Sequence, residues 1–320
     1  MSRKIVCAVS SFTAGQKERI REAAERLGFV CEFYGSAEAA LQAVGDAEII
    51  LGDTPVLTQA APKLRWIFTP SAGINQFGAP DAFASPDAVL TNSSGAYGVT
   101  ISEHIIMVTL ELMRRQSEYN AIVAEKSWIR DLPVRSIRGS RILLLGTGDI
   151  GRETAKRLRA FGPASVRGIN RSGRHPGGEF DEVFPLARLD EFLPETDLLI
   201  LSLPGTPETK GLLSAERLAK LPDGAIVVNV GRGTVIDQTA LEAELRAGRL
   251  KAALDVFEKE PIPADSDFWT CPNLLITPHI AGNMSLPYTV EKVAEFFLED
   301  LERYARSEPL KHQASRAKGY

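Results

Sequence analysis

Short apolar runs alternate with longer amphipathic stretches through the first hundred residues. The apolar runs, each of single-strand length, are residues 4–9, 30–34, 48–51, 64–68 and 88–90. Between the first of these runs, residues 15–27 and 37–44 carry apolar side chains at helical spacing. Strands that alternate with helices in this way are typical of βα units that build a parallel sheet. We therefore expect one α/β domain in this part of the chain.

A longer helical pattern follows, from about residue 100 to residue 121. Ile101, Ile105, Val108 and Leu112 recur at three- and four-residue intervals, and Thr100 is a suitable N-cap. A helix of this length could pass from one domain to the next. His104 lies within it, and we assign this histidine to packing rather than to chemistry.

A second alternating block begins at residue 141 and predicts a second parallel sheet. Its expected strands are 142–145, 165–169, 198–203, 225–230, 251–254 and 274–277, with helices at 150–160, 214–220 and 238–247. The continuous apolar run at 142–145 suits a strand that helices cover on both faces. An amphipathic helix is expected at 286–306, and the polar tail after Glu308 is expected to be frayed.

Composition narrows the class of protein. A chain of 320 residues suggests two domains of roughly 150 residues each. The formal net charge of −4 gives no general basic field, so a nucleic-acid partner is not expected. No apolar run approaches the roughly 18 residues of a membrane span. The cysteines, at positions 7, 31 and 271, are widely spaced and form no CxxC pair, which argues against a disulfide framework or a metal site and favours a reducing cytoplasm.

A glycine-rich loop follows the first strand of the second block. It reads Gly146-Thr-Gly148-Asp149-Ile150-Gly151 and opens a helical pattern. The first glycine permits a tight turn, the second allows the backbone to approach a pyrophosphate, and the third allows the helix to pack on the strand. The helix N-terminus attracts the anion. We interpret the whole loop as a dinucleotide site, while a glycine-rich turn without a ligand remains the alternative.

The next strand ends at the segment Asn170-Arg171-Ser172-Gly-Arg174. An NAD site usually has Asp or Glu here, which accepts hydrogen bonds from the ribose and repels a 2′-phosphate. Asn170 is neutral, and Arg171 and Arg174 can pair with phosphate oxygens. The segment therefore predicts a preference for NADP(H), with NAD(H) possible; two solvated loop arginines are the alternative.

Three further segments each follow a predicted strand and carry a polar residue of chemical interest. These residues are Arg232, Glu260 and His279. In an open parallel sheet, ligands bind beyond the carboxyl ends of the strands, so all three should lie on the edge that carries the glycine loop. Taken singly, Arg232 could be a capping arginine, Glu260 a solvated acid and His279 a structural histidine. Taken together, they predict a catalytic site.

These motifs, in this order, resemble those of the D-isomer-specific 2-hydroxyacid dehydrogenases, in particular the glyoxylate/hydroxypyruvate reductase branch. The resemblance runs from about Trp66 to Gly282. It is carried by the segments 91–95, 102–104, 146–151, 202–209, 229–233, 255–261 and 277–279. It implies a fold of two domains, Rossmann-like and flavodoxin-like, each with a parallel sheet, and an active site in the cleft between them.

The resemblance also implies a role for each site residue. Arg232 matches the arginine that binds the substrate carboxylate, for which a planar guanidinium offers two parallel hydrogen bonds. His279 matches the general acid/base, and Glu260 the carboxylate that orients it. Asp255 matches the residue that holds the nicotinamide carboxamide. Two further groups are implied by position: Pro204 and Thr209 beside the cofactor, and Ser71, Ala72 and Gly73 as a turn whose N–H groups bind the substrate carboxylate.

From this we expect a substrate-binding domain of residues 1–98 plus 284–320 and a dinucleotide-binding domain of residues 99–283. The resemblance further implies a homodimer, in which Trp128 either reaches a neighbouring active site or is buried in its own core. Asn75 stands where the family often has an aspartate, which leaves the substrate side chain open. The expected activity is NADPH-dependent reduction of a small 2-keto acid. A dehydrogenase of another acid, such as phosphite, and a nucleotide-sensing corepressor-like protein remain alternatives.

Overall fold

The computed structural model describes residues 3–316 and residue 319. The chain divides into two compact units, with boundaries between Tyr97 and Gly98 and between Asn283 and Met284. The first unit combines the N-terminal part of the chain with the C-terminal part, and the second unit is the stretch between them. None of the helices in these described residues is long and apolar enough to cross a membrane.

The first unit contains a five-stranded parallel sheet with strand order β2-β1-β3-β4-β5. Its strands are β1 (Arg3–Cys7), β2 (Phe29–Phe33), β3 (Ile49–Leu51), β4 (Trp66–Phe68) and β5 (Val89–Thr91). The central strands β3 and β4 are apolar and buried throughout, and β1 is buried from Ile5 to Cys7, as expected for strands that helices cover on both faces. All five predicted strands are confirmed to within two residues.

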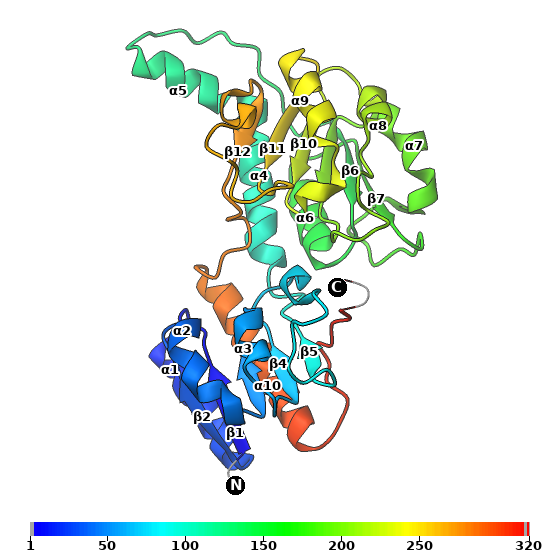
Figure 1. The fold of residues 1–320 in the computed structure, drawn as a ribbon. Helices are drawn as coiled ribbons and strands as arrows, with labels where there is room; N and C mark the ends of the chain where they lie inside the picture. The colour runs from blue at the N-terminus through cyan, green and yellow to red at the C-terminus, as the bar shows by residue number, and fades with distance from the viewer. Residues whose placement is uncertain (1–2, 317–318, 320) are drawn as a thin grey trace. The chain divides into compact units, whose positions relative to one another are not determined.

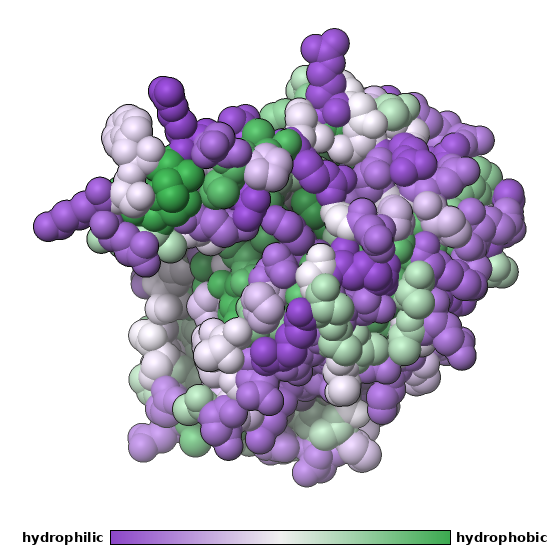
Figure 2. Space-filling model, turned by 90° about the horizontal axis from the view of Figure 1, so that it is seen from above, coloured by the Kyte–Doolittle hydropathy of each residue, from purple (hydrophilic) through white to green (hydrophobic). Residues whose placement is uncertain are grey.

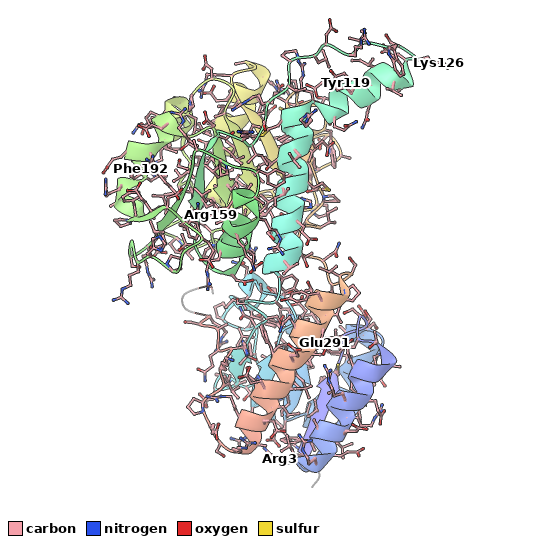
Figure 3. The ribbon with its side chains drawn as sticks, turned by 180° about the vertical axis from the view of Figure 1, so that it is seen from behind. Arg3, Tyr119, Lys126, Arg159, Phe192 and Glu291 are labelled. Carbon is pink, nitrogen blue, oxygen red and sulfur yellow. The ribbon has the colours of Figure 1, made fainter. Side chains whose placement is uncertain are left out.

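Helices of the first unit include α1 (Ala14–Arg26) and α10 (Pro287–Ala305), which lie side by side (Figure 3). Glu291 of α10 binds Gln16 and Arg19 of α1. Deeper in the unit, Phe297 of α10 stacks on Trp66 of β4. The C-terminal helix therefore belongs to the core of the first unit. The remaining helical elements of this unit are α2 (Ala37–Ala40), η1 (Leu41–Asp46), α3 (Pro55–Gln59) and η2 (Asn75–Phe77).

The prediction of a frayed C-terminal tail is wrong for its described residues. Leu310 is buried, and Gln313 forms an antiparallel bridge with Thr91 at the edge of the sheet. Asp300 of α10, which is fully buried, accepts the backbone N–H groups of Lys311 and His312. The polar composition of the tail does not predict this order, because the tail is held by hydrogen bonds of its backbone and not by a stripe of apolar side chains.

The second unit contains a seven-stranded parallel sheet with strand order β12-β11-β10-β9-β6-β7-β8. Its strands are β6 (Arg141–Leu145), β7 (Ser165–Asn170), β8 (Glu182–Pro185), β9 (Leu198–Leu201), β10 (Ile226–Asn229), β11 (Lys251–Leu254) and β12 (Leu274–Ile276). The order reverses at β6, which is the topological switch point where doubly wound sheets bind nucleotides. The edge strand β8 is not predicted from the sequence, because it is short, only partly buried and ends in a proline, which cannot donate to a sheet.

The single long helix predicted from residue 100 is wrong in its extent. The structure has α4 (Gly98–Arg114) and α5 (Gln116–Ala124), separated by Arg115 in the left-handed conformation. No residue of α5 is buried, and Figure 1 shows α5 standing clear of the sheet. The apolar periodicity continues through α5, but α5 extends beyond the surface on which α4 packs. Other helical elements are α6 (Asp149–Arg159), η3 (Leu186–Arg188), α7 (Leu189–Phe192), η4 (Leu193–Glu195), α8 (Ala215–Lys220), η5 (Gly233–Val235), α9 (Gln238–Arg246) and η6 (Asp267–Thr270).

Candidate active site

An imidazole and a carboxylate form a close pair beyond the carboxyl ends of β11 and β12. Nδ1 of His279 lies 2.6 Å from Oε2 of Glu260. The other carboxylate oxygen, Oε1, accepts the backbone N–H of Phe257 at 2.8 Å. An ionised carboxylate only accepts hydrogen bonds, so the imidazole donates from Nδ1. This fixes the ring orientation and leaves Nε2 for a ligand, and about half of the His279 side chain is exposed (51%).

The turn that carries His279 wraps around Asp255, which is buried. The carboxylate of Asp255 accepts the Thr277 hydroxyl at 2.6 Å and the backbone N–H groups of Ile280 and Ala281 at 2.9 Å each. Its main-chain carbonyl accepts the N–H of His279. Asp255 therefore organises the turn in addition to the cofactor contact that the resemblance implies for it.

The loop that carries Arg232 follows β10 and is held by a buried amide. Asn229 accepts the N–H of Gly231 at 3.0 Å and donates to the carbonyl of Arg232 at 2.9 Å. A side chain on Gly233 would place its Cβ 2.0 Å from the main chain of Phe257. The Arg232 loop and the loop that leads to Glu260 therefore pack backbone to backbone, which only glycine allows.

The charges of the site act on one another. Burial lowers the pKa of the Arg232 guanidinium from its ordinary 12.5, and the negative charge of Glu260 opposes that shift. The close packing of Gly233 on Phe257 and Glu258 places the Arg232 loop beside the loop that leads to Glu260. The structure thus gathers a guanidinium, a carboxylate and an imidazole, which are distant along the chain, at one edge of the seven-stranded sheet.

The glycine loop lies at the same edge, between β6 and α6. Gly146 has φ +105°, a conformation that favours glycine. A Cβ on Gly151 would lie 2.1 Å from the carbonyl oxygen of Gly146, so the start of α6 packs directly on the loop. Gly148 is the N-cap of α6, so its N-terminus has no capping side chain and can face an anion. Ile150 lies in this first turn, and the side chain of Asp149 faces Gly98 at the start of α4.

The segment after β7 forms an ordered loop around Asn170. Its Oδ1 accepts the N–H groups of Ser172 and Gly173, and its Nδ2 donates to Thr147 in the glycine loop at 2.8 Å. The Asn170 amide therefore ties the two loops together. Arg171 and Arg174 extend from this loop with exposed side chains. The residues present fit a dinucleotide whose ribose carries a phosphate, because the loop presents cations and no carboxylate.

The segment after β9 also lies at this edge. The hydroxyl of Thr209, which is buried, donates to the carbonyl of Pro204 at 2.6 Å and accepts the N–H of Thr206 at 2.9 Å. Thr209 therefore shapes the loop from within. Ser202, which begins the 202–209 segment but was not predicted as a site residue, lies against Gly146.

In the first unit, the Ser71–Gly73 turn follows β4 at the carboxyl edge of the five-stranded sheet. The Ser71 hydroxyl donates to Asp53, which follows β3, at 2.5 Å. Asn92, which follows β5, donates to the carbonyl of Ala72 at 2.6 Å. The turn is therefore braced from both neighbouring strands. The structure describes its position only within this unit, so its contact with a substrate carboxylate stays a prediction.

Three polar residues that hold the site were not predicted as site residues: Asn229, Thr277 and His104. The imidazole of His104 lies 3.2 Å from the Thr277 hydroxyl and 3.9 Å from Asp255. Asn229 and Thr277 lie within motif segments that the sequence reasoning quoted, and His104 occupies an apolar position of the α4 pattern. Each of the three could have been found as a polar side chain at a position where the apolar pattern of its strand or helix predicts burial. Within the described residues, no group of three His, Cys, Asp or Glu side chains could hold a metal ion.

Comparison with known proteins gives a consistent result. A family model for the NAD-binding domain of D-isomer specific 2-hydroxyacid dehydrogenases matches residues 106–281, which is more than half of the chain. Glyoxylate/hydroxypyruvate reductase A of Salmonella newport (strain SL254) is 30% identical over 273 residues, covering 83% of this chain and 85% of that protein.

Solved structures resemble the whole chain. A D-isomer specific 2-hydroxyacid dehydrogenase family protein from Aeromonas salmonicida subsp. salmonicida A449 has a TM-score of 0.87 and 33% identity, and the match covers 99% of this chain and 100% of that one. An NADPH-dependent glyoxylate/hydroxypyruvate reductase from Sinorhizobium meliloti, in complex with NADP and sulfate, has a TM-score of 0.82 and 27% identity, with 99% and 100% covered.

Proposed function

Because the chain belongs to the D-isomer specific 2-hydroxyacid dehydrogenase family, we propose that it reduces a small 2-keto acid of the glyoxylate or hydroxypyruvate type with NADPH. The observation that carries this proposal is the 2.6 Å pair of His279 and Glu260 at the sheet edge that also holds Arg232 and the glycine loop. An acid/base, a carboxylate-binding cation and a dinucleotide loop are the three parts that such a reaction requires.

Arg232, Glu260 and His279 each have a separate role in the proposed reaction. Arg232 binds the substrate carboxylate and polarises the neighbouring carbonyl. Glu260 holds the ring of His279, whose Nε2 donates the proton to the carbonyl oxygen in reduction and accepts it from the hydroxyl in oxidation. The nicotinamide ring, when bound, supplies or takes up the hydride. A positioned acid of this kind is typically worth about 10²–10⁴ in rate.

We assign the second unit to the cofactor and the first unit to the substrate. Gly146, Gly148 and Gly151, with the N-terminus of α6, hold the pyrophosphate, and the loop from Asn170 to Arg174 holds the 2′-phosphate. Asp255, Pro204 and Thr209 shape the nicotinamide side of the site. In the first unit, the turn formed by Ser71, Ala72 and Gly73 is assigned to the substrate carboxylate.

The direct test is a panel of small 2-keto acids assayed with NADPH and with NADH by the loss of nicotinamide absorbance. We expect glyoxylate or hydroxypyruvate to be reduced, and NADPH to give the higher kcat/KM. A panel that includes phosphite oxidation separates a dehydrogenase of another acid. No turnover with any acid, combined with retention of a partner protein only in the presence of nucleotide, would favour the corepressor-like alternative.

The cofactor preference is tested by Arg171→Ala and Arg174→Ala, separately and together. Each charge-assisted hydrogen bond to phosphate is worth roughly 1.5–3 kcal/mol. We expect the double variant to raise the KM for NADPH by at least tenfold and to leave the KM for NADH nearly unchanged. Arg188→Ala is the matched control, because Arg188 is also an exposed arginine of this unit and lies outside the loop from Asn170 to Arg174. Equal loss with both cofactors would contradict the assignment.

We also propose a homodimer built on the arm, which we define as α5 and the segment up to residue 134. Four large hydrophobic side chains of the arm are exposed, at 66% (Val123), 89% (Trp128), 50% (Ile129) and 46% (Val134). Figure 2, which looks at the molecule from above Figure 1, shows green surface on the side where the arm extends. Exposed apolar groups that cluster in this way are typical of association surfaces.

The dimer is tested by sedimentation of the wild type and of Val123→Asp/Ile129→Asp. We expect a dimer for the wild type and a monomer for the variant, because burying two carboxylates in an apolar contact is unfavourable. Glu125→Gln, on the same arm, is the control. If Trp128 reaches a neighbouring active site, Trp128→Ala will change the KM for the keto acid by more than Val123→Ala, which removes an apolar side chain from the same arm. A wild type that sediments as a monomer at all concentrations contradicts the proposal.

A cytoplasmic location is proposed on the state of the cysteines. Cys7, Cys31 and Cys271 are free thiols and are buried. Burial raises the pKa of the Cys7 thiol to about 12 and also raises that of Cys31, so both are unreactive thiols. Free buried thiols suit a reducing compartment.

A further inference from the structure

His104 occupies a position on α4 that the helix pattern reserves for an apolar side chain. It lies one helical turn from Ile101 and from Val108, which are both buried, and its side chain is only 10% exposed. Burial of an imidazole costs free energy that a leucine at this position would not. A buried polar side chain at a position where the helix pattern expects an apolar one, with no packing reason for it, indicates that the residue holds other groups in position.

In the two hydrogen bonds that link His104, Thr277 and Asp255, the donor is in each case the group nearer to His104. The hydroxyl of Thr277 has a single proton, which it donates to Oδ1 of Asp255 at 2.6 Å. The same hydroxyl oxygen lies 3.2 Å from Nε2 of His104, so it accepts from the imidazole. This assignment of the tautomer follows from the network. A relay therefore runs from the His104 N–H, through the Thr277 hydroxyl, to the carboxylate of Asp255.

The relay ends on the turn that carries the acid/base. Asp255 accepts the backbone N–H groups of Ile280 and Ala281 through its carboxylate and that of His279 through its carbonyl. His279 itself has φ +54°, a left-handed conformation that a non-glycine residue adopts at a cost of roughly 1 kcal/mol or more. Such a conformation persists only where surrounding bonds fix it, and here those bonds converge on Asp255.

We propose that His104 is a positioning residue for His279, and that it acts by fixing the Thr277 hydroxyl and through it the Asp255 carboxylate that holds the His279 turn. The inference rests on the proposed function for its catalytic consequence. Its structural consequence, a turn that loosens when the relay is cut, does not depend on which substrate is used.

The charge state of His104 is consistent with this role. Burial lowers the pKa of its imidazole, and the negative charge of Asp255 opposes the shift. Asp255 is the charged group that faces His104 from the sheet side, and Thr277 is its hydrogen-bonding neighbour. A lowered pKa favours the neutral ring, which fits a single hydrogen bond donated to the Thr277 hydroxyl.

The test compares His104→Gln, His104→Asn and His104→Leu. The glutamine amide can reach the place of Nε2, whereas the shorter asparagine amide cannot. We expect kcat to fall by roughly tenfold to 100-fold in the Leu and Asn variants, with KM for the keto acid changed less than threefold, because a small displacement of a catalytic group costs rate more than binding. We expect the Gln variant to recover most of the loss.

Thr277→Val tests whether His104 acts through the threonine. We expect the His104→Leu/Thr277→Val double variant to lose no more rate than Thr277→Val alone, because His104 acts through that hydroxyl. The matched control is Thr109→Val. Thr109 is a buried polar residue of the same helix, and its hydroxyl has no hydrogen-bond partner among the described residues. We expect this control to keep the wild-type kcat.

Hydrogen–deuterium exchange gives a readout that is independent of activity. We expect the amides of Ile280 and Ala281 to exchange about tenfold faster or more in His104→Leu and Thr277→Val, and at the wild-type rate in His104→Gln and Thr109→Val. Faster exchange in a protein that reduces no keto acid would support the relay and reject the proposed function. Unchanged exchange, additive losses in the double variant, or equal rates for Gln and Asn would overturn the inference.

Discussion

Replacement of His279 by alanine is expected to lower kcat by about 10²–10⁴-fold, the usual contribution of a positioned general acid. The reason is geometric, since Nδ1 of His279 is already occupied by Glu260 and only Nε2 remains to serve the substrate oxygen. The KM for the keto acid should change far less, because the proton is needed in the transition state more than in the bound substrate. Steady-state kinetics with NADPH and the best substrate of the panel will measure both.

Two companion variants sharpen this prediction. Glu260→Gln keeps the shape of the partner and removes its charge, so it should retain more activity than His279→Ala. His312→Ala removes another histidine, one that stacks on Phe296 in the first unit, and serves as a control. An undiminished rate in His279→Ala would refute the proton-donor assignment, whatever the other variants do.

Replacement of Arg232 by lysine is expected to lower kcat/KM by roughly 10²–10³-fold. Lysine keeps the positive charge but offers a point charge in place of a planar pair of N–H donors. Loss of one partner from a buried, charge-assisted contact costs about 2–5 kcal/mol, and about 1.4 kcal/mol corresponds to a factor of ten. Both kcat and KM should change, because the arginine binds the carboxylate and polarises the carbonyl.

The control for Arg232 is Arg246→Lys, which keeps an exposed ion pair with Glu242. An exposed pair of this kind contributes about 1 kcal/mol or less, so no change in kinetics is expected. If Arg232→Lys reduced the keto acid with wild-type kcat/KM, the carboxylate would have to be bound elsewhere, and the role of the Arg232 loop would need to be reassigned.

The sequence predicts most of the strands because a buried parallel strand is a continuous apolar run, as at Ile142–Leu145. It also brings Arg232, Glu260 and His279 to one edge, since each follows a strand and parallel strands end on the same side. It does not predict the break at Arg115, because periodicity continues through α5 after the packing surface has ended.

The positions of Asn229 and His104 show a second limit of prediction from the sequence, which concerns hydrogen-bond partners. Their hydrogen-bond partners lie next to one another only after folding: Thr277 is 173 positions from His104 along the chain. A pattern of apolar and polar residues identifies which face is buried, but it does not identify which buried polar groups will pair. The geometry of the sheet edge supplies that information.

The C-terminal tail has a consequence for how copies of the chain meet. β5 is an outer strand of the smaller sheet, and an uncovered outer strand is a template for pairing with another polypeptide. Gln313 and its neighbours occupy the free side of β5 through backbone bonds to Thr91, Asn92 and Leu90. The tail therefore covers the free side of β5, and we expect a recombinant version shortened before Leu310 to aggregate more readily while it keeps the catalytic residues.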